Sequence, residues 1–504
     1  MFYQPTIDAV RSYDTSLYYR NGIHHLFIQY RSPGHTGPGC DGMALATSAD
    51  GVHFDEIGPI FTKGDATDAM GGISRTWRAG DRYLLSFSER QGGVQYIRFA
   101  ESDDLVHWRR LGDEHRFGPD PRWYDDTPVG RWDDLWVLPK EDGTGFLGYL
   151  TARPWNRTEG IPFESFALAE SEDGLRWRAR PPVVIDWGDW PPMSVGEVAG
   201  VEKIGDRYYL IQHYAEHMLG NRQVREHLGR DEGMYVFVAD RPDGPFRPDL
   251  ESYRLPPTYN VFMRFHAAGG ETLVNHKSVA RCGRGSRSWM PPLKRAVVDP
   301  DGHLRLGYWP GNDAVKGERI GIDLARCAVV GVPTYRNAAG HRWRMSPGWL
   351  EAHEPHGGGV ALLANRFDLD RGIVLEGSMR IEEPPKRWSG IGLFVEEDAE
   401  IHAGTGMVLQ TRGRAELGPF RASGSTKVIP YSTFKPDDIV QATIVPGRTC
   451  RFRVLARRGL VELYHDELLI QCYSLPREPT GRIGLIVESG SAVFEGLEAW
   501  QMNL

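Results

Sequence analysis

Three acidic residues, Asp14, Asp134 and Glu197, each stand directly before a stretch that is expected to form a β-strand. Two carboxyl groups that face each other can divide acid–base work. A protonated one gives a proton to a leaving oxygen, and an ionised one attacks carbon or activates water. A third carboxylate can keep the first one protonated by like-charge repulsion. Such a set is suited to cleaving a glycosidic bond.

The choice of aspartate in the middle segment depends on spacing, because Asp133 and Asp134 are adjacent. Asp134 is followed by an apolar pair at +3 and +4 and by Asp-Gly at +8 and +9. Asp14 is followed by a similar pair at the same spacing and by Asn-Gly at +7 and +8. We therefore place Asp134 in the matched position, and Asp133 is the alternative.

The strands that must position these acids belong to a repeat. One phrase, consisting of a strand, a tight Asp-Gly-type turn and a second strand opened by an aromatic residue or leucine, recurs at intervals of roughly 50 to 70 residues. Its copies are Ala46–Phe54, Ala100–Trp108, Ala169–Trp177 and, more weakly, Ala239–Phe246 and Val298–Leu304. Such repeats are typical of propeller blades. The innermost strands of a propeller line its central channel, so acids that precede them meet at one mouth.

The pattern predicts an all-β chain, a five-bladed β-propeller followed by a C-terminal β-sandwich. The propeller is expected in residues 1–312. Residues 313–365 are interpreted as an irregular linker that leads into the sandwich. Alternating strands at a spacing of about ten residues resume in residues 366–504, and their pattern favours two packed sheets.

Composition excludes several functional classes. The net charge of −8, from 59 Lys and Arg against 67 Asp and Glu, disfavours nucleic acid and anionic membranes as partners. No apolar run of about 18 residues is present, which argues against a transmembrane helix. The first residues lack a basic and apolar leader, so we expect a cytoplasmic protein. Five scattered cysteines without a CxxC argue against disulfides and zinc, and no metal or cofactor is expected.

The segments around the three acids resemble the five-bladed glycoside hydrolases of families 32, 43 and 68, most closely family 32 with its C-terminal sandwich. Residues 14–27, Asp-Thr-Ser-Leu-Tyr-Tyr-Arg-Asn-Gly-Ile-His-His-Leu-Phe, are similar to the strand that follows the nucleophile in family 32 and the general base in family 43. Residues 197–210 fit the segment Glu-x-Pro-x-Leu-x-Lys-x-Gly-x-x-Tyr-x-Leu, whose glutamate is the proton donor. Asp134 fits the aspartate of an Arg-Asp-Pro segment, the transition-state stabiliser.

The resemblance is incomplete in each segment. Blade one lacks Trp-Met-Asn-Asp-Pro-Asn-Gly, blade three has Trp-Asp-Asp-Leu in place of Arg-Asp-Pro, and blade four has Glu-Val-Ala in place of Glu-Cys-Pro. These departures bear on the identity of the sugar more than on the class of reaction.

The resemblance implies a glycoside hydrolase that removes a furanoside from the chain end with retention, similar to a β-fructofuranosidase. Asp14 is then the nucleophile, Glu197 the acid/base and Asp134 the stabiliser. Burial and the like charges of Asp14 and Asp134 are expected to raise the pKa of Glu197. Two alternatives stay open. One is an inverting, family-43-like α-L-arabinofuranosidase or β-xylosidase, in which Asp14 activates water. The other is a sugar-binding propeller without catalysis.

Five further residues are candidates for contact with an oligosaccharide or glycoside: Arg131, Asp133, Trp155, Trp187 and His276. Aromatic rings suit the apolar faces of sugars, although tryptophan packs in cores more often. His276 lies on the expected inner hairpin of blade five, and family 43 members often place a histidine in the channel. A histidine satisfied within its strand is the competing interpretation. Whether the chain forms a homo-oligomer, and what the sandwich does, stay open.

Overall fold

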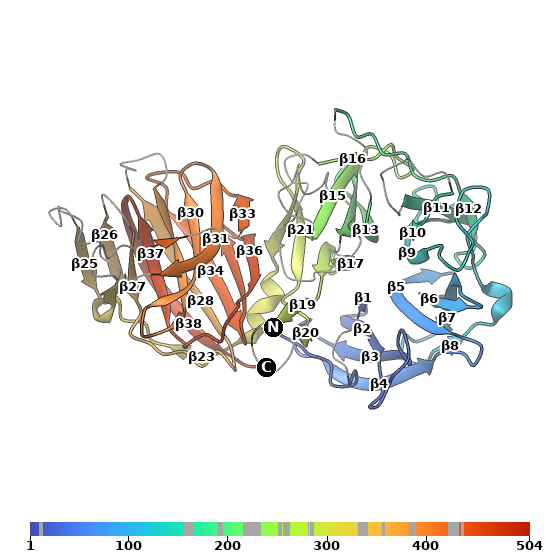
Figure 1. Ribbon diagram of the computed structural model, residues 1–504, viewed down its shortest axis with the longest axis horizontal. Coiled ribbons are helices and arrows are strands. Elements are labelled where there is room, and N and C mark those ends of the chain that lie inside the picture. The colour runs from blue at the N-terminus through green and yellow to red at the C-terminus, as the bar shows by residue number, and fades with distance from the viewer. Residues whose placement is uncertain are drawn as a thin grey trace.

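In the computed structural model, four-stranded antiparallel sheets follow one another around a ring (Figure 1). Blades one and two consist of β1 (Thr15–Arg20), β2 (Ile23–Tyr30), β3 (Gly42–Ser48), β4 (Asp55–Thr62), β5 (Ala69–Ala79), β6 (Arg82–Gln91), β7 (Val94–Ser102) and β8 (Arg109–Arg110). Blades three and four consist of β9 (Trp132–Pro139), β10 (Phe146–Ala152), β11 (Ser165–Ser171), β12 (Arg178–Arg180), β13 (Glu197–Ile204), β14 (Arg207–Tyr214), β15 (Gly233–Ala239) and β16 (Arg247–Pro248).

Blade five completes the ring and continues into the second domain. Its strands are β17 (Arg264–Ala268), β18 (Glu271–Asn275), β21 (Lys294–Val298) and β22 (Leu304–Tyr308), and a small hairpin of β19 (Ser278–Ala280) and β20 (Arg287–Trp289) lies between β18 and β21. Each inner strand, β1, β5, β9, β13 and β17, contacts the next, and β17 contacts β1. The ring therefore closes with five blades, and the expected propeller is confirmed.

The structure describes residues 1–9, 14–155, 165–189, 195–214, 233–249, 255, 263–280, 282, 287–330, 341–354, 358–382, 389–421, 433–434 and 438–504. Helical segments in these ranges are short 3₁₀ turns such as Pro310–Val315. None of the helices described is long and apolar enough to cross a membrane. All five cysteines are free thiols.

The repeated phrase forms the turn between the third and fourth strands of a blade. In blade two, Asp104 Oδ1 accepts hydrogen bonds from the backbone N–H groups of Val106 (2.9 Å) and His107 (2.8 Å). Asp50 and Asp173 accept the equivalent bonds in blades one and three. The phrase therefore recurs because an aspartate in this position satisfies the backbone donors of a tight turn.

The aromatic residue that ends the phrase packs on the preceding blade. Trp108 of blade two lies edge-on to Phe27 of blade one, with ring centroids 5.3 Å apart. Trp177 of blade three lies in the same way against Trp77 of blade two, at 6.3 Å. Such ring pairs add about 0.5–1.5 kcal/mol to the burial of their apolar surface. Each copy of the phrase thus closes one blade and joins it to its neighbour.

Two sheets form the sandwich. The first contains β36 (Leu468–Ser474), β35 (Leu460–His465), β34 (Cys450–Arg457), β28 (Ile373–Ile381), β38 (Ser491–Met502), β26 (Trp349–His353), β25 (Arg342–Ser346) and β23 (Lys316–Ile320). The second contains β24 (Ala328–Val330), β27 (Gly358–Leu362), β37 (Ile483–Glu488), β29 (Gly390–Asp398), β30 (Ala403–Gln410), β31 (Arg414–Arg421), β32 (Thr433–Phe434) and β33 (Asp438–Gln441). Buried side chains such as Leu393, Leu463 and Leu485 fill the space between them.

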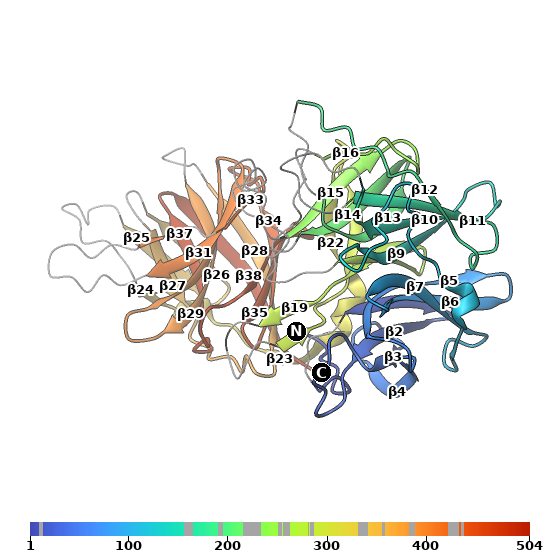
Figure 2. The ribbon, with the colours of Figure 1, turned by 45° about the vertical axis from the view of Figure 1, so that its right-hand side comes forward.

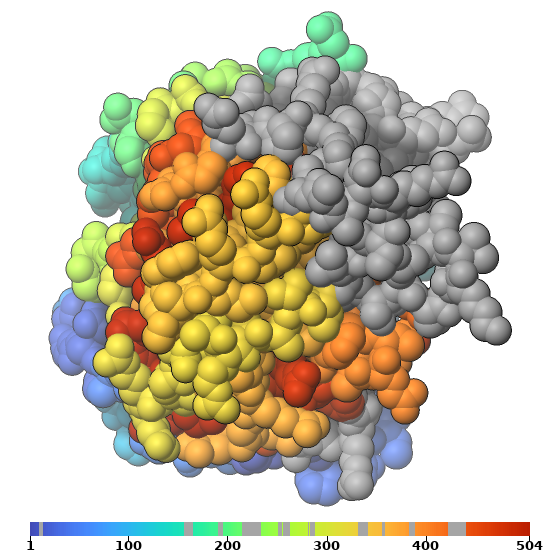
Figure 3. All heavy atoms as spheres, turned by 90° about the vertical axis from the view of Figure 1, so that its left-hand side faces the viewer, coloured from blue at the N-terminus to red at the C-terminus, as the bar shows by residue number. Residues whose placement is uncertain are grey.

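Residues 313–365 differ from the irregular linker that the sequence suggested. They supply β23, β25 and β26 to the first sheet and β24 and β27 to the second, where β26 pairs with β38 and β27 with β37. Figure 3 shows these yellow to gold segments side by side with orange and red ones on the end of the sandwich. The strands were missed because they are three to five residues long and several are largely exposed, which removes the apolar alternation.

One hydrogen-bonded sheet runs from blade five into the sandwich (Figure 2). β22 pairs with β36 at Gly307 and Leu468, and the Tyr308 N–H donates to the Glu467 carbonyl at 2.7 Å. The Arg453 guanidinium lies 3.5 Å from the centre of the Tyr308 ring. The sandwich is therefore fixed to the blade that closes the ring.

Candidate active site

Asp14 lies directly before the inner strand of blade one. Its carbonyl oxygen accepts a hydrogen bond from the Gln29 N–H (3.2 Å), which extends the pairing of β1 and β2 to this residue. The ammonium of Lys277, from the loop after β18 in blade five, contacts Asp14 Oδ1 at 2.7 Å. Both side chains remain partly accessible, Asp14 to 26 % and Lys277 to 20 %.

Asp133 and Asp134 both face the mouth because β9 is irregular at this point. Adjacent side chains of a regular strand point to opposite faces. Here the pairing of β9 with β10 shifts between Tyr149 and Thr151, and Asp134 adopts a left-handed conformation with φ of 58°. Arg131 Nη2 consequently lies 3.8 Å from Asp133 and 3.9 Å from Asp134. Both of the adjacent aspartates therefore belong to the cluster.

Glu197 is the first residue of β13 in blade four. Its Oε1 is in direct contact with the same Arg131 Nη2, and its Oε2 lies 3.1 Å from Nδ1 of His213 on β14. The Thr151 hydroxyl donates to Asp134 Oδ2 (3.1 Å) and accepts from the backbone N–H that follows Glu197 (2.8 Å). One guanidinium and one hydroxyl thus join the acids of blades three and four.

Arg264, the first residue of β17, approaches the same acids from blade five. Its Nη2 lies 3.6 Å from Asp134 Oδ1, and its Nη1 donates to the Ser74 carbonyl at 2.9 Å. The charges of Arg264 and Glu197 both act on Asp14. The structure therefore brings Asp14, Asp134 and Glu197 to one mouth of the propeller, as the matched positions predicted.

The surroundings separate the pKa values of these acids. Burial raises the pKa of Asp134 well above its ordinary value, and the charges of Asp133 and Glu197 raise it further. Burial acts on Asp14 in the same direction, but the Lys277 ammonium outweighs it, and the pKa of Asp14 falls below its ordinary value. In the free protein, Asp134 is the carboxyl that most readily holds a proton.

The expectation of a raised pKa for Glu197 is wrong for this state of the protein. Burial raises the pKa of Glu197, but the charge of Arg131 and the hydrogen bond from His213 together outweigh burial and hold the pKa below its ordinary value. The sequence showed the neighbouring acids but not the guanidinium that would be placed against Glu197.

The two candidate tryptophans have different environments. Trp155 follows β10, and the last residue of β10 pairs with the first residue of β9 at the mouth. The Trp155 side chain is 44 % exposed. Trp187 packs its ring edge-on against Phe237 at 5.8 Å, next to a buried apolar core. Trp155 is therefore available to a ligand, whereas the contacts of Trp187 are those of a core residue.

His276 does not belong to the carboxylate cluster, so its expected contact with substrate is wrong. The side chain is completely buried where blade five meets the sandwich, and its Nε2 lies 2.8 Å from Lys294 Nζ. The sequence correctly placed His276 at the inner hairpin of blade five. The residue lies just past the end of β18, where its side chain turns toward the second domain.

Two cations of the site, Lys277 and Arg264, and the histidine His213 were not predicted from sequence. The acids could be found because three of them share a position relative to a repeat. Arg264 is the first residue of β17, the equivalent position in blade five, but it is a base and does not share the residue type that marks the other positions. Lys277 adjoins His276 and carries no signal of its own.

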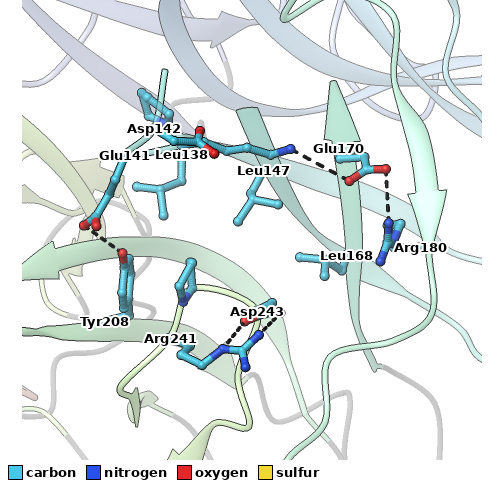
Figure 4. Close-up of a pocket in the computed structure, with 13 residues that line it drawn as sticks. Leu138, Glu141, Asp142, Leu147, Leu168, Glu170, Arg180, Tyr208, Arg241 and Asp243 are labelled. Atoms are coloured by element: carbon cyan, nitrogen blue, oxygen red, sulfur yellow. Dashed lines mark hydrogen bonds and ion pairs between the residues drawn. The ribbon is translucent and has the colours of Figure 1, made fainter. Parts of the chain in front are cut away.

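A separate hollow of about 410 Å³ lies between blades three and four, near the other end of β9 (Figure 4). Leu138 stands four residues beyond Asp134 along this strand, a separation of about 13 Å. Several charged side chains around the hollow are paired with one another: Glu170 with Arg180 at 3.2 Å, and Arg241 with Asp243 at 2.7 Å. Ion pairs of this kind are common between side chains of surface turns. Asp14, Asp134 and Glu197 do not line this hollow.

Comparisons with known proteins find similarity in structure but not in sequence. No protein-family model matches the chain, and no curated protein matches it in sequence. The structure is similar to that of sucrose-6-phosphate hydrolase from Lactobacillus gasseri, with a TM-score of 0.64, 12 % identity, and coverage of 96 % of this chain and 89 % of that chain.

Two further solved structures cover the whole of this chain. A variant of fructan 1-exohydrolase IIa from Cichorium intybus in complex with 1-kestose has a TM-score of 0.65, 13 % identity and 97 % coverage of its own length. Exo-inulinase from Aspergillus awamori has a TM-score of 0.63, 12 % identity and 97 % coverage. Another similar structure is described as a family 32 β-fructofuranosidase from Bombyx mori. The expected family 32 architecture, a propeller with a C-terminal sandwich, is thereby confirmed as the fold.

Proposed function

We propose that this chain is a glycoside hydrolase that cleaves a furanoside from the chain end, in the manner of a β-fructofuranosidase. The observation that carries the proposal is the meeting of Asp14, Asp134 and Glu197 from three blades, with Arg131 in contact with the last two. The fold shared with enzymes named for fructoside cleavage supports it.

The proposed reaction has two steps. Asp14, held ionised, attacks the anomeric carbon while the leaving oxygen takes a proton from Glu197. Water then attacks the same carbon, Glu197 takes the water proton, and Asp14 departs as a carboxylate. Asp134 stabilises the positive charge that develops on the sugar ring in both steps.

The proton must move before the first step. Asp134 holds it in the free protein, because Arg131 keeps Glu197 ionised. A sugar hydroxyl that draws the guanidinium toward Asp133 and Asp134 raises the pKa of Glu197 and lowers that of Asp134. The proton then passes to Glu197, which becomes the acid, and Asp134 becomes the anion that the transition state needs. Arg131 therefore links binding to the protonation state.

We propose retention of the anomeric configuration, because the sandwich follows the propeller as it does in family 32. Retaining pairs of carboxyl groups stand about 5–5.5 Å apart, and inverting pairs stand about 6.5–9.5 Å apart. An NMR time course of the first sugar released tests this step. Release of the inverted anomer would make Asp14 the base that activates water and would move the assignment to the family-43-like alternative.

A substrate screen tests the reaction class. Wild type and Glu197→Gln are incubated with sucrose, 1-kestose and inulin, and with aryl α-L-arabinofuranosides and β-xylosides. Fructose released by the wild type alone supports the proposal. Release of arabinose or xylose favours the inverting alternative. Saturable binding of a saccharide without release by either protein would identify a sugar-binding propeller instead.

A further inference from the structure

The turn His276–Lys277 joins the mouth of the propeller to the sandwich. It connects the end of β18 to the start of β19, and β19 lies against β36 of the sandwich (Figures 1 and 2). The two side chains point in different directions. Lys277 reaches Asp14 Oδ1 at 2.7 Å, whereas His276 enters a completely buried polar cluster at the domain junction. A single backbone step thus separates an active-site contact from an interdomain contact.

The buried cluster is built from both domains. Lys294 on β21 donates to the Pro292 carbonyl (2.7 Å), lies 2.8 Å from His276 Nε2, and is ion-paired with Glu462 on β35. Glu462 also accepts a hydrogen bond from the Tyr464 hydroxyl at 2.7 Å. Burial and the charge of Lys294 lower the pKa of His276, so its ring is neutral and can accept a hydrogen bond from the ammonium.

The ammonium occupies the place that a metal ion would need. Ligand atoms of His276, Glu462 and Cys472 lie within 4.8 Å of one another, a grouping that could otherwise hold a cation. Lys294 Nζ stands in contact with two of these three residues. The cluster is therefore already neutralised by the chain itself, and it serves to hold the His276–Lys277 turn against the sandwich.

We propose that Lys277 is a further catalytic residue of the glycosidase and that Glu462 and Lys294 are positioning residues that act through His276. This rests on the proposed function. In the second step the bond between the anomeric carbon and Asp14 breaks, and its electron pair returns to the Asp14 carboxylate. The water that attacks supplies the new C–O bond and gives its proton to Glu197. The Lys277 ammonium stabilises the returning negative charge and keeps Asp14 ionised between turnovers.

Four charged or titratable groups face Asp14 and can affect how its ionisation depends on pH. Lys277 comes from the loop after β18, Arg264 from β17 and Glu197 from β13, and their charges act on the carboxylate. The thiol of Cys40 is close enough for Asp14 to raise its pKa. Of the two cations, Arg264 also faces Asp134 and donates to a backbone carbonyl, whereas Lys277 is in direct contact with Asp14.

The variant Lys277→Met tests the proposed catalytic role of Lys277. The acid limb of the kcat/KM profile, which reports the ionisation of Asp14, should move to higher pH by about one unit, and Lys277→Arg should restore most of the shift. A covalent intermediate should accumulate, seen as a burst of released aglycone, because the second step slows. Lys203→Met is the matched control, since it removes an ion-paired lysine near the other end of the propeller. An unmoved acid limb without a burst overturns the role of Lys277.

A stability measurement separates this proposal from the function itself. The folded pKa of Asp14 is depressed, so its ion pair contributes stability above the unfolded pKa of about 3.9 and loses it as pH falls. Wild type should therefore exceed Lys277→Met in unfolding temperature at pH 7, and the difference should shrink toward pH 3. If this pattern appears and no glycoside is cleaved, the Lys277–Asp14 contact stands and the proposed function fails. A pH-independent difference contradicts the contact.

The double variant Lys294→Met, Glu462→Gln tests the positioning half. Removing both charges leaves neither member of this ion pair buried without its partner, so the chain should still fold. Its acid limb should move in the same direction as that of Lys277→Met, by a smaller amount. The control is Arg412→Met, Glu416→Gln, an ion pair of the second sandwich sheet away from the turn. Loss of stability in both double variants with unchanged pH profiles would show that the junction is structural only.

Discussion

Carboxylates with shifted pKa values occur in both domains, but their surroundings differ. At the propeller mouth, Asp14 and Glu197 keep 26 % and 18 % of their side chains accessible. In the second sandwich sheet, burial raises the pKa of Glu488 to about 7, and the charge of Glu416 adds to the effect. Gln410 on the neighbouring strand donates to Glu416 at 2.9 Å.

The difference lies in where the acids come from. The mouth acids lie at or near the start of inner strands of separate blades, so different elements of the ring bring them together. The sandwich acids lie on strands of one sheet and are held by partners within that sheet, such as Arg412, which contacts Glu416 at 2.6 Å. A pKa near 7 would suit a general acid, but the groups that act on Glu488, such as Gln410 and Glu416, lie on strands of its own sheet. Convergence, rather than the size of a pKa shift, marks the candidate site.

The largest effect should come from Asp14→Asn. Loss of the carboxylate that attacks carbon should lower kcat by about 10³-fold or more. The matched control is Glu488→Gln, which also neutralises a shifted carboxylate and should keep kcat within about twofold, since Glu488 lies outside the carboxylate cluster at the mouth. Steady-state rates on the best substrate of the screen measure both. Comparable losses of kcat in the two variants would show that the converging carboxylates of the propeller are not more important for catalysis than Glu488.

Glu488→Gln should instead change stability in a pH-dependent way. The folded pKa of about 7 exceeds an unfolded value of about 4.3, so the wild type loses stability as pH rises from 4 through 7. Glutamine does not ionise, and the variant should be more stable than wild type by about 2–4 kcal/mol at pH 8, relative to their difference at pH 4. Denaturant unfolding at the two pH values measures this. The same difference at both would mean that Glu488 titrates normally.

Sequence predicted those features of the site that repeat. Asp14, Asp134 and Glu197 could be found because each lies at or near the start of an inner strand. The phrase around Asp50 and its counterparts has a local physical cause in its turn. What could not be predicted depends on contacts between distant segments. Lys277 lies 263 residues from Asp14 in sequence, and the contact exists only because the ring closes.

The same limit applies within one blade and at the domain junction. The bulge that turns both Asp133 and Asp134 to the mouth depends on the pairing of β9 with β10, which no spacing reveals. His276 could be placed on its hairpin, but its burial depends on Glu462, 186 residues later in a second domain. Several strands of residues 313–365 are short and exposed, so they lack an apolar pattern. They belong to a sheet because they pair with strands much later in the chain.

Asp134→Asn should shift the alkaline limb of the kcat/KM profile to lower pH by about one unit. The macroscopic pKa of the cluster falls, because the proton then has only Glu197 to occupy, whose pKa Arg131 and His213 hold low. Arg131→Gln should move the limb the other way, since removing a positive charge disfavours every ionised carboxyl nearby. A pH series on both variants measures the shifts. Shifts of the same sign would show that Asp134 does not hold the proton.

The smallest effect should distinguish the two tryptophans. Trp155→Ala should raise KM about two- to fivefold with kcat unchanged, because an exposed ring at the mouth contributes to binding rather than to chemistry. Trp187→Ala should leave KM unchanged and lower the free energy of unfolding by about 1–3 kcal/mol, since its ring packs against Phe237. Paired kinetic and denaturation measurements separate the outcomes. A rise in KM for Trp187→Ala alone would contradict both assignments.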